Sequence, residues 1–174
     1  MHHTAHYTQM CYVGDKPADC KLALFCDASF AGELTDSKST TGAYLCLVGP
    51  KSFVPISWIC KKQGAVSHSS SEAEIIALDA ALRMEGLPAL QLWETMVEVF
   101  APGTKAVRKP AEVPKAEPHT IAEYLSQVDY VPYTLPKSSG LGKLLVFEDN
   151  EAVIKMFVQG RSPTLRHVAR THRV

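Results

Sequence analysis

Three acidic residues lie at positions in this sequence where their side chains could converge and bind metal ions. Asp27 ends an apolar segment of strand length, Glu74 lies near the start of an expected helix, and Asp149 follows a second apolar segment. Carboxylates brought together repel one another unless a cation neutralises them, and carboxylate oxygens are ligands that Mg²⁺ prefers. The pattern therefore predicts a site for divalent cations built from these three side chains.

Glutamates near the start of the expected helix also have a structural interpretation. Glu74 follows Ser71 by three positions, and Glu72 follows Ser69 by the same interval. A serine followed three residues later by glutamate is the pattern of a capping box, in which each side chain bonds to the backbone N–H of the other residue. Either glutamate could therefore serve only to begin the helix.

The two aspartates have alternative roles as well. Asp149 precedes an expected helix and could be its N-cap, because an aspartate oxygen accepts hydrogen bonds from the first helical turn. Asp27 could begin a turn with Ala28 and Ser29. However, an acid that finishes a strand apolar on both faces is costly to bury without a partner. The metal site is therefore predicted from the conjunction of the three acids, and not from any one of them.

Short apolar runs bounded by turn residues predict the strands that would carry the two aspartates. The expected strands are 21–27, 43–48, 53–60 and 144–147. Turn residues between the second and third runs indicate that the first three strands form an antiparallel meander. Trp58 and Trp93 are expected to be anchors of the core.

Helical spacing of apolar residues predicts three helical stretches. Serines 69–71 precede a helix over 72–82, and residues 86–88, Gly-Leu-Pro, are expected to kink or break it. Pro88 is well placed to begin a second stretch that reaches about Phe100. A last helix is expected over 151–159.

The composition is that of an ordinary globular protein of one domain. The chain has 174 residues, 46% of them hydrophobic, and 18 basic residues balance 18 acidic ones. The five cysteines form no Cys-x-x-Cys pair, which argues against disulfides and a zinc site. No leader resembles a signal peptide, and no apolar stretch approaches the roughly 18 residues of a membrane span. We therefore expect a soluble intracellular protein that is not secreted and contacts no membrane.

The segment 101–142 differs in character from the rest of the chain. It holds six of the eleven prolines together with scattered lysines and glutamates. Such a composition is typical of a segment that contributes little to a packed core. We expect an insertion outside the core, with a short helix at 121–128.

Five blocks of sequence follow one another in a specific order. They are residues 27–32, 36–44, 56–58 with 61–63, 69–78 and 148–152. Together they resemble the ribonuclease H domain of copia-type retrotransposon polyproteins. The resemblance covers 21–100 and 143–174, and residues 1–20 resemble the remnant of a linker from an upstream reverse transcriptase. The resemblance to the ribonuclease H domain implies an α/β fold with a mixed sheet. Three of its strands are antiparallel, a fourth is parallel to the first, and helices pack on the sheet.

The resemblance also implies an activity and a set of catalytic residues. Members of the family hydrolyse the RNA strand of an RNA/DNA hybrid with two Mg²⁺ ions, for which Mn²⁺ can substitute, and need no small-molecule cofactor. Asp27 matches the first aspartate of the family, Glu74 the helix glutamate, and Asp149 the aspartate after the fourth strand. These three residues are expected to be both catalytic and metal-binding.

Partners are implied by the same resemblance. The expected partners are an RNA/DNA hybrid and the reverse transcriptase domain of the same polyprotein, in a cytoplasmic particle or in the nucleus. The residues expected to contact nucleic acid are Lys61, Lys62, Ser29, Asn150 and Arg166. For the basic residues, the alternative is that they only form solvated faces.

Two other interpretations stay open from the sequence. The family continues with a fifth strand and a fourth metal-binding aspartate, whereas this sequence stops at Val174. The chain could therefore be an impaired remnant of a retroelement that at most binds nucleic acid. An integrase or resolvase of the same superfold is the other alternative. The Lys-Ser-Thr-Thr-Gly and Ser-Ser-Glu-Ala-Glu blocks favour ribonuclease H over this second alternative.

Overall fold

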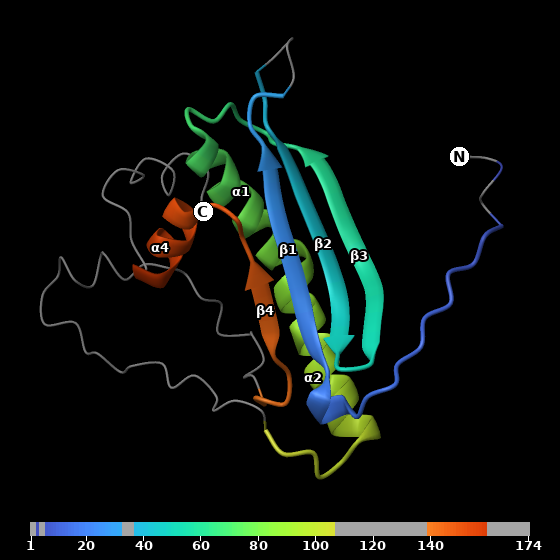
Figure 1. Ribbon diagram of the computed structural model, residues 1–174. Coiled ribbons are helices and arrows are strands. Elements are labelled where there is room, and N and C mark those ends of the chain that lie inside the picture. Colours follow the sequence, from blue (N-terminus) through green and yellow to red (C-terminus); the bar gives the residue numbers. More distant parts are fainter. Residues whose placement is uncertain (1–2, 4–5, 33–36, 107–138, 160–174) are drawn as a thin grey trace, which may run out of the picture.

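The chain folds around a four-stranded mixed sheet with helices packed on it, as Figure 1 shows. This computed structural model describes residues 3, 6–32, 37–106 and 139–159. The strands are β1 (Lys21–Ser29), β2 (Thr40–Gly49), β3 (Ser52–Lys62) and β4 (Leu144–Phe147). Their order across the sheet is β3-β2-β1-β4. Neighbouring strands among the first three are antiparallel, and β4 is parallel to β1, so the predicted ribonuclease H-like α/β arrangement is confirmed.

Three of the strands, β1, β2 and β3, are longer than their apolar runs predict. β2 begins at Thr40 and β3 continues through Lys62, because these two residues pair with each other at the end of the ladder. Backbone pairing with a neighbour thus extends a strand into polar sequence, since the ladder satisfies N–H and C=O groups whatever the side chain is. As a result, both lysines of the 61–63 block lie on a strand and not in a loop.

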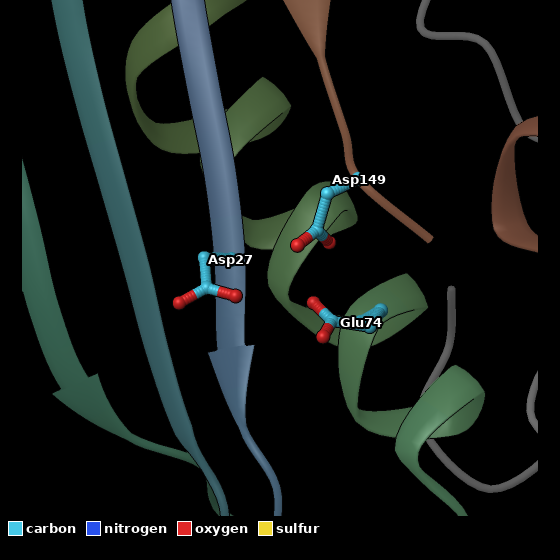
Figure 2. A group of neighbouring side chains, drawn as sticks. All are labelled: Asp27, Glu74 and Asp149. Carbon is cyan, nitrogen blue, oxygen red and sulfur yellow. The ribbon is translucent and has the colours of Figure 1, made fainter. Parts of the chain in front are cut away.

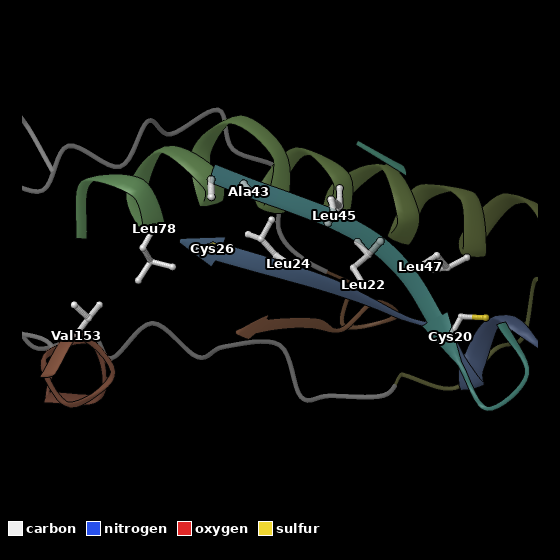
Figure 3. Close-up of a cluster of buried hydrophobic side chains, with 10 residues drawn as sticks. Cys20, Leu22, Leu24, Cys26, Ala43, Leu45, Leu47, Leu78 and Val153 are labelled. Atoms are coloured by element: carbon white, nitrogen blue, oxygen red, sulfur yellow. The ribbon is translucent and has the colours of Figure 1, made fainter. Parts of the chain in front are cut away.

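The core lies between the sheet and the helices (Figure 3). Alternate residues of β1 and β2 point to this face, because successive side chains of a strand alternate between its two faces. Side chains from α1 (Ser70–Ala81) and α4 (Glu151–Gln159) complete the cluster. Its buried members are Cys20, Leu22, Leu24, Cys26, Ala43, Leu45, Leu47, Leu78, Ala81 and Val153. Burial of this apolar surface holds α1 against the sheet and α4 against α1.

Aromatic side chains form a row across the opposite face of the sheet. Strand pairing aligns Phe147 with Phe25, Phe25 with Tyr44, and Tyr44 with Trp58. The rings of Phe25 and Phe147 stack with centroids 4.7 Å apart. Trp58 is 73% exposed, so its prediction as a core anchor is wrong. Its neighbour Ile59 packs against the core instead, because the alternation of β3 places Trp58 on the outer face.

The helical region after β3 is continuous, with an irregular turn at the predicted break. A π-helical turn, Leu82–Gly86, joins α1 to α2 (Leu87–Phe100). Pro88 has no N–H to donate to the preceding turn, which interrupts the regular α-helical pattern there. In place of the expected kink or break, the structure has a π-helical turn within a continuous helical stretch. Throughout the described residues, no helix combines the length and apolar character that crossing a membrane requires.

Hydrogen bonds to α2 hold the residues that precede β4. The buried carboxylate of Glu94 accepts hydrogen bonds from the backbone N–H groups of Ser139, at 3.1 Å, and Gly142, at 3.3 Å. These bonds fix the residues just before β4 and so place that strand beside β1. The expected helix at 121–128 lies outside the described residues, as does most of the predicted insertion.

We predict that Gly86→Val lowers the free energy of unfolding by about 1–3 kcal/mol through overpacking. A Cβ atom at Gly86 would lie 2.9 Å from Leu24 Cδ2 and 3.1 Å from Leu144 Cδ2, which join the helices to β1 and β4. Urea denaturation measures the change. Gly64→Val is the matched control, because nothing lies within 4 Å of its Cβ position. Equal destabilisation by both substitutions would contradict the close approach at Gly86.

Candidate metal centre

The carboxylates of Asp27, Glu74 and Asp149 converge at one end of the sheet (Figure 2). Asp27 lies near the end of β1, Asp149 follows β4 by two residues, and Glu74 projects from the beginning of α1. Each residue offers one oxygen atom, and these atoms all lie within 4.8 Å of one another. Because β1 and β4 are parallel neighbours, their carboxyl ends meet at the same edge, which brings the two aspartates together.

The different lengths of β1 and β4 allow Glu74 to reach this edge. β4 ends opposite Phe25, so β1 continues to Ser29 without a β4 partner. The backbone N–H of Ala28, in this unpaired stretch, donates a hydrogen bond to the Glu74 carboxylate. Ala28 packs against the fully buried Ala73 and Ala77 of α1, and these small side chains let the helix approach β1 closely. Glu74 therefore takes a position that a longer β4 would occupy.

Ser69 is the N-cap of α1, and the side chain of Glu72 bonds to the residue before the cap. The Ser69 hydroxyl accepts a hydrogen bond from the Glu72 N–H at 3.1 Å, and the Glu72 carboxylate accepts one from the His68 N–H at 2.7 Å. The first of these bonds satisfies an N–H group that has no partner within the helix, and the second fixes the residue before the cap. The alternative role of Glu74 as a capping residue is therefore wrong.

The structural alternatives for the two aspartates are also wrong. Asn150 caps α4, because its Oδ1 accepts hydrogen bonds from the N–H groups of Ala152 and Val153 at 3.1 and 3.2 Å. Asp149 is thus not the cap. Asp27 lies within β1, where it pairs with Gly42 of β2, so it does not begin a turn. Both aspartate side chains are exposed, which leaves them accessible to ions and to a substrate.

Glu74 is held in an unfavourable environment for a charged group. Its side chain is only 7% exposed, and its Oε2 has no hydrogen-bond partner within the described part of the chain. Burial, together with the negative charges of Glu148, Asp27 and Asp149, raises the pKa of Glu74 to about 7, although the hydrogen bond from Ala28 opposes this rise. A cation among these carboxylates would remove the repulsion between them and supply the contact that Glu74 Oε2 lacks.

Glu148 is an acidic residue of this region that the prediction of site residues missed. Burial raises the pKa of Glu148, as do the charges of Asp149 and Asp27, while a hydrogen bond from the Asn150 N–H lowers it. The sequence signal for Glu148 is that it is a second acid directly beside Asp149 at the end of a predicted strand.

The donor atoms at this centre fit a hard divalent cation. All three groups are carboxylates, and oxygen ligands favour Mg²⁺, Mn²⁺ or Ca²⁺ over softer metals. Mg²⁺ binds oxygen at about 2.1 Å, so two ligands of one ion lie at most about 4.2 Å apart. The three oxygens lie within 4.8 Å of one another, a bound slightly above this maximum, so small movements of the side chains would let them share ions. The unsatisfied Oε2 of Glu74 is the buried atom that such an ion would contact.

Gln63 holds the beginning of α1 against the end of the sheet. Its buried amide donates hydrogen bonds to the backbone oxygen of Ala73, at 2.9 Å, and to Thr41 Oγ1, at 3.2 Å. Its Oε1 accepts a bond from the Ser67 hydroxyl at 3.1 Å. One side chain thus joins β2, the segment before α1, and the residue next to Glu74. Gln63 belongs to the 61–63 block, but its type alone did not reveal this role.

The residues expected to contact nucleic acid have different locations. Lys62 pairs with Thr40, which pairs with Ser29, so these residues lie at one level of the sheet, at the same end as the acids. Lys61 precedes them on β3, and Asn150 uses its side-chain oxygen to cap α4. Arg166 lies outside the described residues. Their contact with nucleic acid stays a prediction.

No known family model matches this sequence, and no curated protein or solved structure is significantly similar to it. Its function must therefore be argued from the arrangement of its own residues.

We predict that the stability of the metal-free protein falls as the pH rises from about 4.5 to about 7. The pKa of Glu74 is about 7 in the folded chain, above its ordinary value of 4.5. Between these values the unfolded chain loses a proton that the folded chain keeps, so the free energy of unfolding decreases with pH. Thermal unfolding in EDTA at several pH values, compared with Glu74→Gln, measures this contribution. An identical pH dependence in the variant would contradict the raised pKa.

We also predict that Gln63→Leu lowers the free energy of unfolding by about 2 kcal/mol or more, because buried partners of the amide lose their hydrogen bonds. Chemical denaturation measures the loss. Gln91→Leu is a control for the change of residue type, because Gln91 is exposed on α2. If Gln63→Leu were as stable as the wild type, the amide would not hold α1 in place.

Proposed function

We propose that this chain is a metal-dependent nuclease of the ribonuclease H type, which hydrolyses the RNA strand of an RNA/DNA hybrid. The observation that carries the proposal is the convergence of three carboxylates from separate elements, with ligand atoms within 4.8 Å of one another. The ribonuclease H-like sheet and the sequence blocks that resemble copia-type polyproteins support the same activity. A reverse transcriptase domain of the same polyprotein is the proposed partner.

The three acids would bind the cations from different sides, according to the exposure of each side chain. Glu74, buried and fixed by the Ala28 N–H, would hold a cation on the protein side. Asp27 and Asp149 are exposed and would hold the cations on the side that faces the substrate. When bound, two Mg²⁺ ions supply an activated water and stabilise the charge on the leaving oxygen of a phosphodiester. The rigid ends of β1 and β4 keep these ligands in place, because both strands lie in one hydrogen-bonded sheet.

Basic residues at the same end of the sheet would orient the substrate. Lys61 and Lys62 lie at the end of β3, two strands away from Asp27. Lysines position a nucleic acid by contact with its phosphates, which gives no sequence preference. Discrimination of RNA from DNA would come from the 2′-hydroxyl groups in the wide minor groove of the hybrid. The proposed substrate is therefore defined by its shape and sugar, and not by its sequence.

The proposal predicts Mg²⁺-dependent cleavage of a labelled RNA/DNA hybrid, with the DNA strand left intact. Asp27→Asn and Glu74→Gln should each lower the rate at least about 100-fold, because removal of residues that only support a metal ligand already costs 10–100-fold. Gel analysis of the end-labelled RNA strand measures the rate. EDTA should abolish cleavage, and Mn²⁺ should restore it.

Asp79→Asn is the matched control for Glu74→Gln. Asp79 lies on the same helix but forms an ion pair with Arg83 and takes no part in the acidic cluster. Its substitution should leave the rate within about twofold of the wild type, because exposed ion pairs contribute little to stability. Binding of the hybrid without Mg²⁺-dependent cleavage would contradict the nuclease proposal and favour a remnant that only binds nucleic acid.

A further inference from the structure

Glu148 lies at the metal centre but has no assigned role there. It follows β4 directly and precedes Asp149. Its Oε1 accepts a hydrogen bond from the Asn150 N–H at 3.3 Å. Its Oε2 is buried and has no hydrogen-bond partner among residues that the structure describes. A buried carboxylate oxygen without a partner is unfavourable, because it has lost water and gained nothing in exchange.

The charged groups around Glu148 are the acids of the cluster itself. Asp149 and Asp27 act on Glu148 through their negative charges, and Glu148 is the charged neighbour with the largest effect on Glu74. Glu74, which is more than nine-tenths buried, has an unpartnered Oε2 as well. Glu74 and the half-buried Glu148 therefore each have one buried oxygen without a hydrogen-bond partner among the described residues. Positive charge placed among the acids would compensate both at once.

The three converging acids alone do not balance the charge of two Mg²⁺ ions. Two Mg²⁺ ions carry four positive charges, whereas Asp27, Glu74 and Asp149 carry three negative ones. A fourth carboxylate near the cluster would complete the balance before any substrate arrives. Glu148 does not belong to the group whose ligand atoms lie within 4.8 Å of one another, so its effect is that of a charge beside the ligands.

We propose that Glu148 is a positioning residue of the metal centre, whose negative charge strengthens the binding of divalent cations by the three converging carboxylates. The inference rests on the proposed metal-dependent function. It differs from a structural role, because the hydrogen bond that Glu148 accepts from the Asn150 N–H needs an oxygen atom but no charge. A glutamine at this position keeps the oxygen and removes the charge.

The test compares Glu148→Gln with Glu151→Gln in the full chain. Glu151 is a matched control, because it is an exposed glutamate at the start of α4 that forms an ion pair with Lys155. Isothermal calorimetry measures the Kd for Mg²⁺ and for Mn²⁺, and thermal unfolding in EDTA measures the stability of the metal-free protein. Glu148→Gln should weaken metal binding about 10-fold, as is typical when a residue that supports metal ligands is changed. Glu151→Gln should bind metal like the wild type.

The stability of the metal-free variant separates the proposed role from a structural one. Removing an uncompensated buried charge from among like charges should leave the melting temperature of Glu148→Gln unchanged or raise it. Glu148→Asp, which keeps the charge, should recover part of the metal affinity. A lower melting temperature with unchanged affinity for Mg²⁺ would overturn the inference and show a structural role.

The same measurements distinguish failure of this inference from failure of the proposed function. If Asp27→Asn abolishes Mg²⁺ binding while Glu148→Gln binds normally, the metal centre stands and the role of Glu148 is overturned. If the wild-type chain binds neither Mg²⁺ nor Mn²⁺, both proposals are overturned together.

Discussion

Repulsion among buried and half-buried carboxylates is the constraint on which this structure depends. Glu74 is buried beside three other acids, and among the described residues the backbone N–H of Ala28 is the group that compensates its charge. Folding therefore places negative charges together at the expense of the stability of the metal-free chain. Functional sites commonly carry such unfavourable groups, because the ligand or ion that binds there restores what the folded protein lacks.

The arrangement of strands is what makes this concentration of charge possible. A sheet with fully paired strands would leave no space for a helix side chain at the edge of β1. Because β4 pairs only with residues 22–25, the last part of β1 presents free backbone groups toward α1. Ala28, Ala73 and Ala77 bring the helix close enough for Glu74 to use one of them. The metal centre is thus a consequence of unequal strand length and of small side chains between two elements.

The sequence predicted the strands, the helices and the three converging acids, because these follow from local periodicity and from the ends of apolar runs. It did not predict the outward orientation of Trp58, since a one-residue change of register moves a side chain to the other face. The roles of Gln63 and Glu148 were also missed. Both depend on contacts between distant segments, such as Gln63 with Ala73, which residue type and spacing do not specify.

The start of α1 shows how a structural and a chemical role can be assigned to neighbouring residues without conflict. Glu72 and Glu74 are two positions apart, and each helical residue turns the chain by about 100°, so their side chains leave the helix on nearly opposite sides. Once Ser69 caps the helix, Glu72 is directed back toward His68. The same phase directs Glu74 to β1 and the aspartates. The packing of Ala73 and Ala77 against Ala28 fixes the rotation of α1 about its axis, so this contact between helix and strand determines whether the three carboxylates meet.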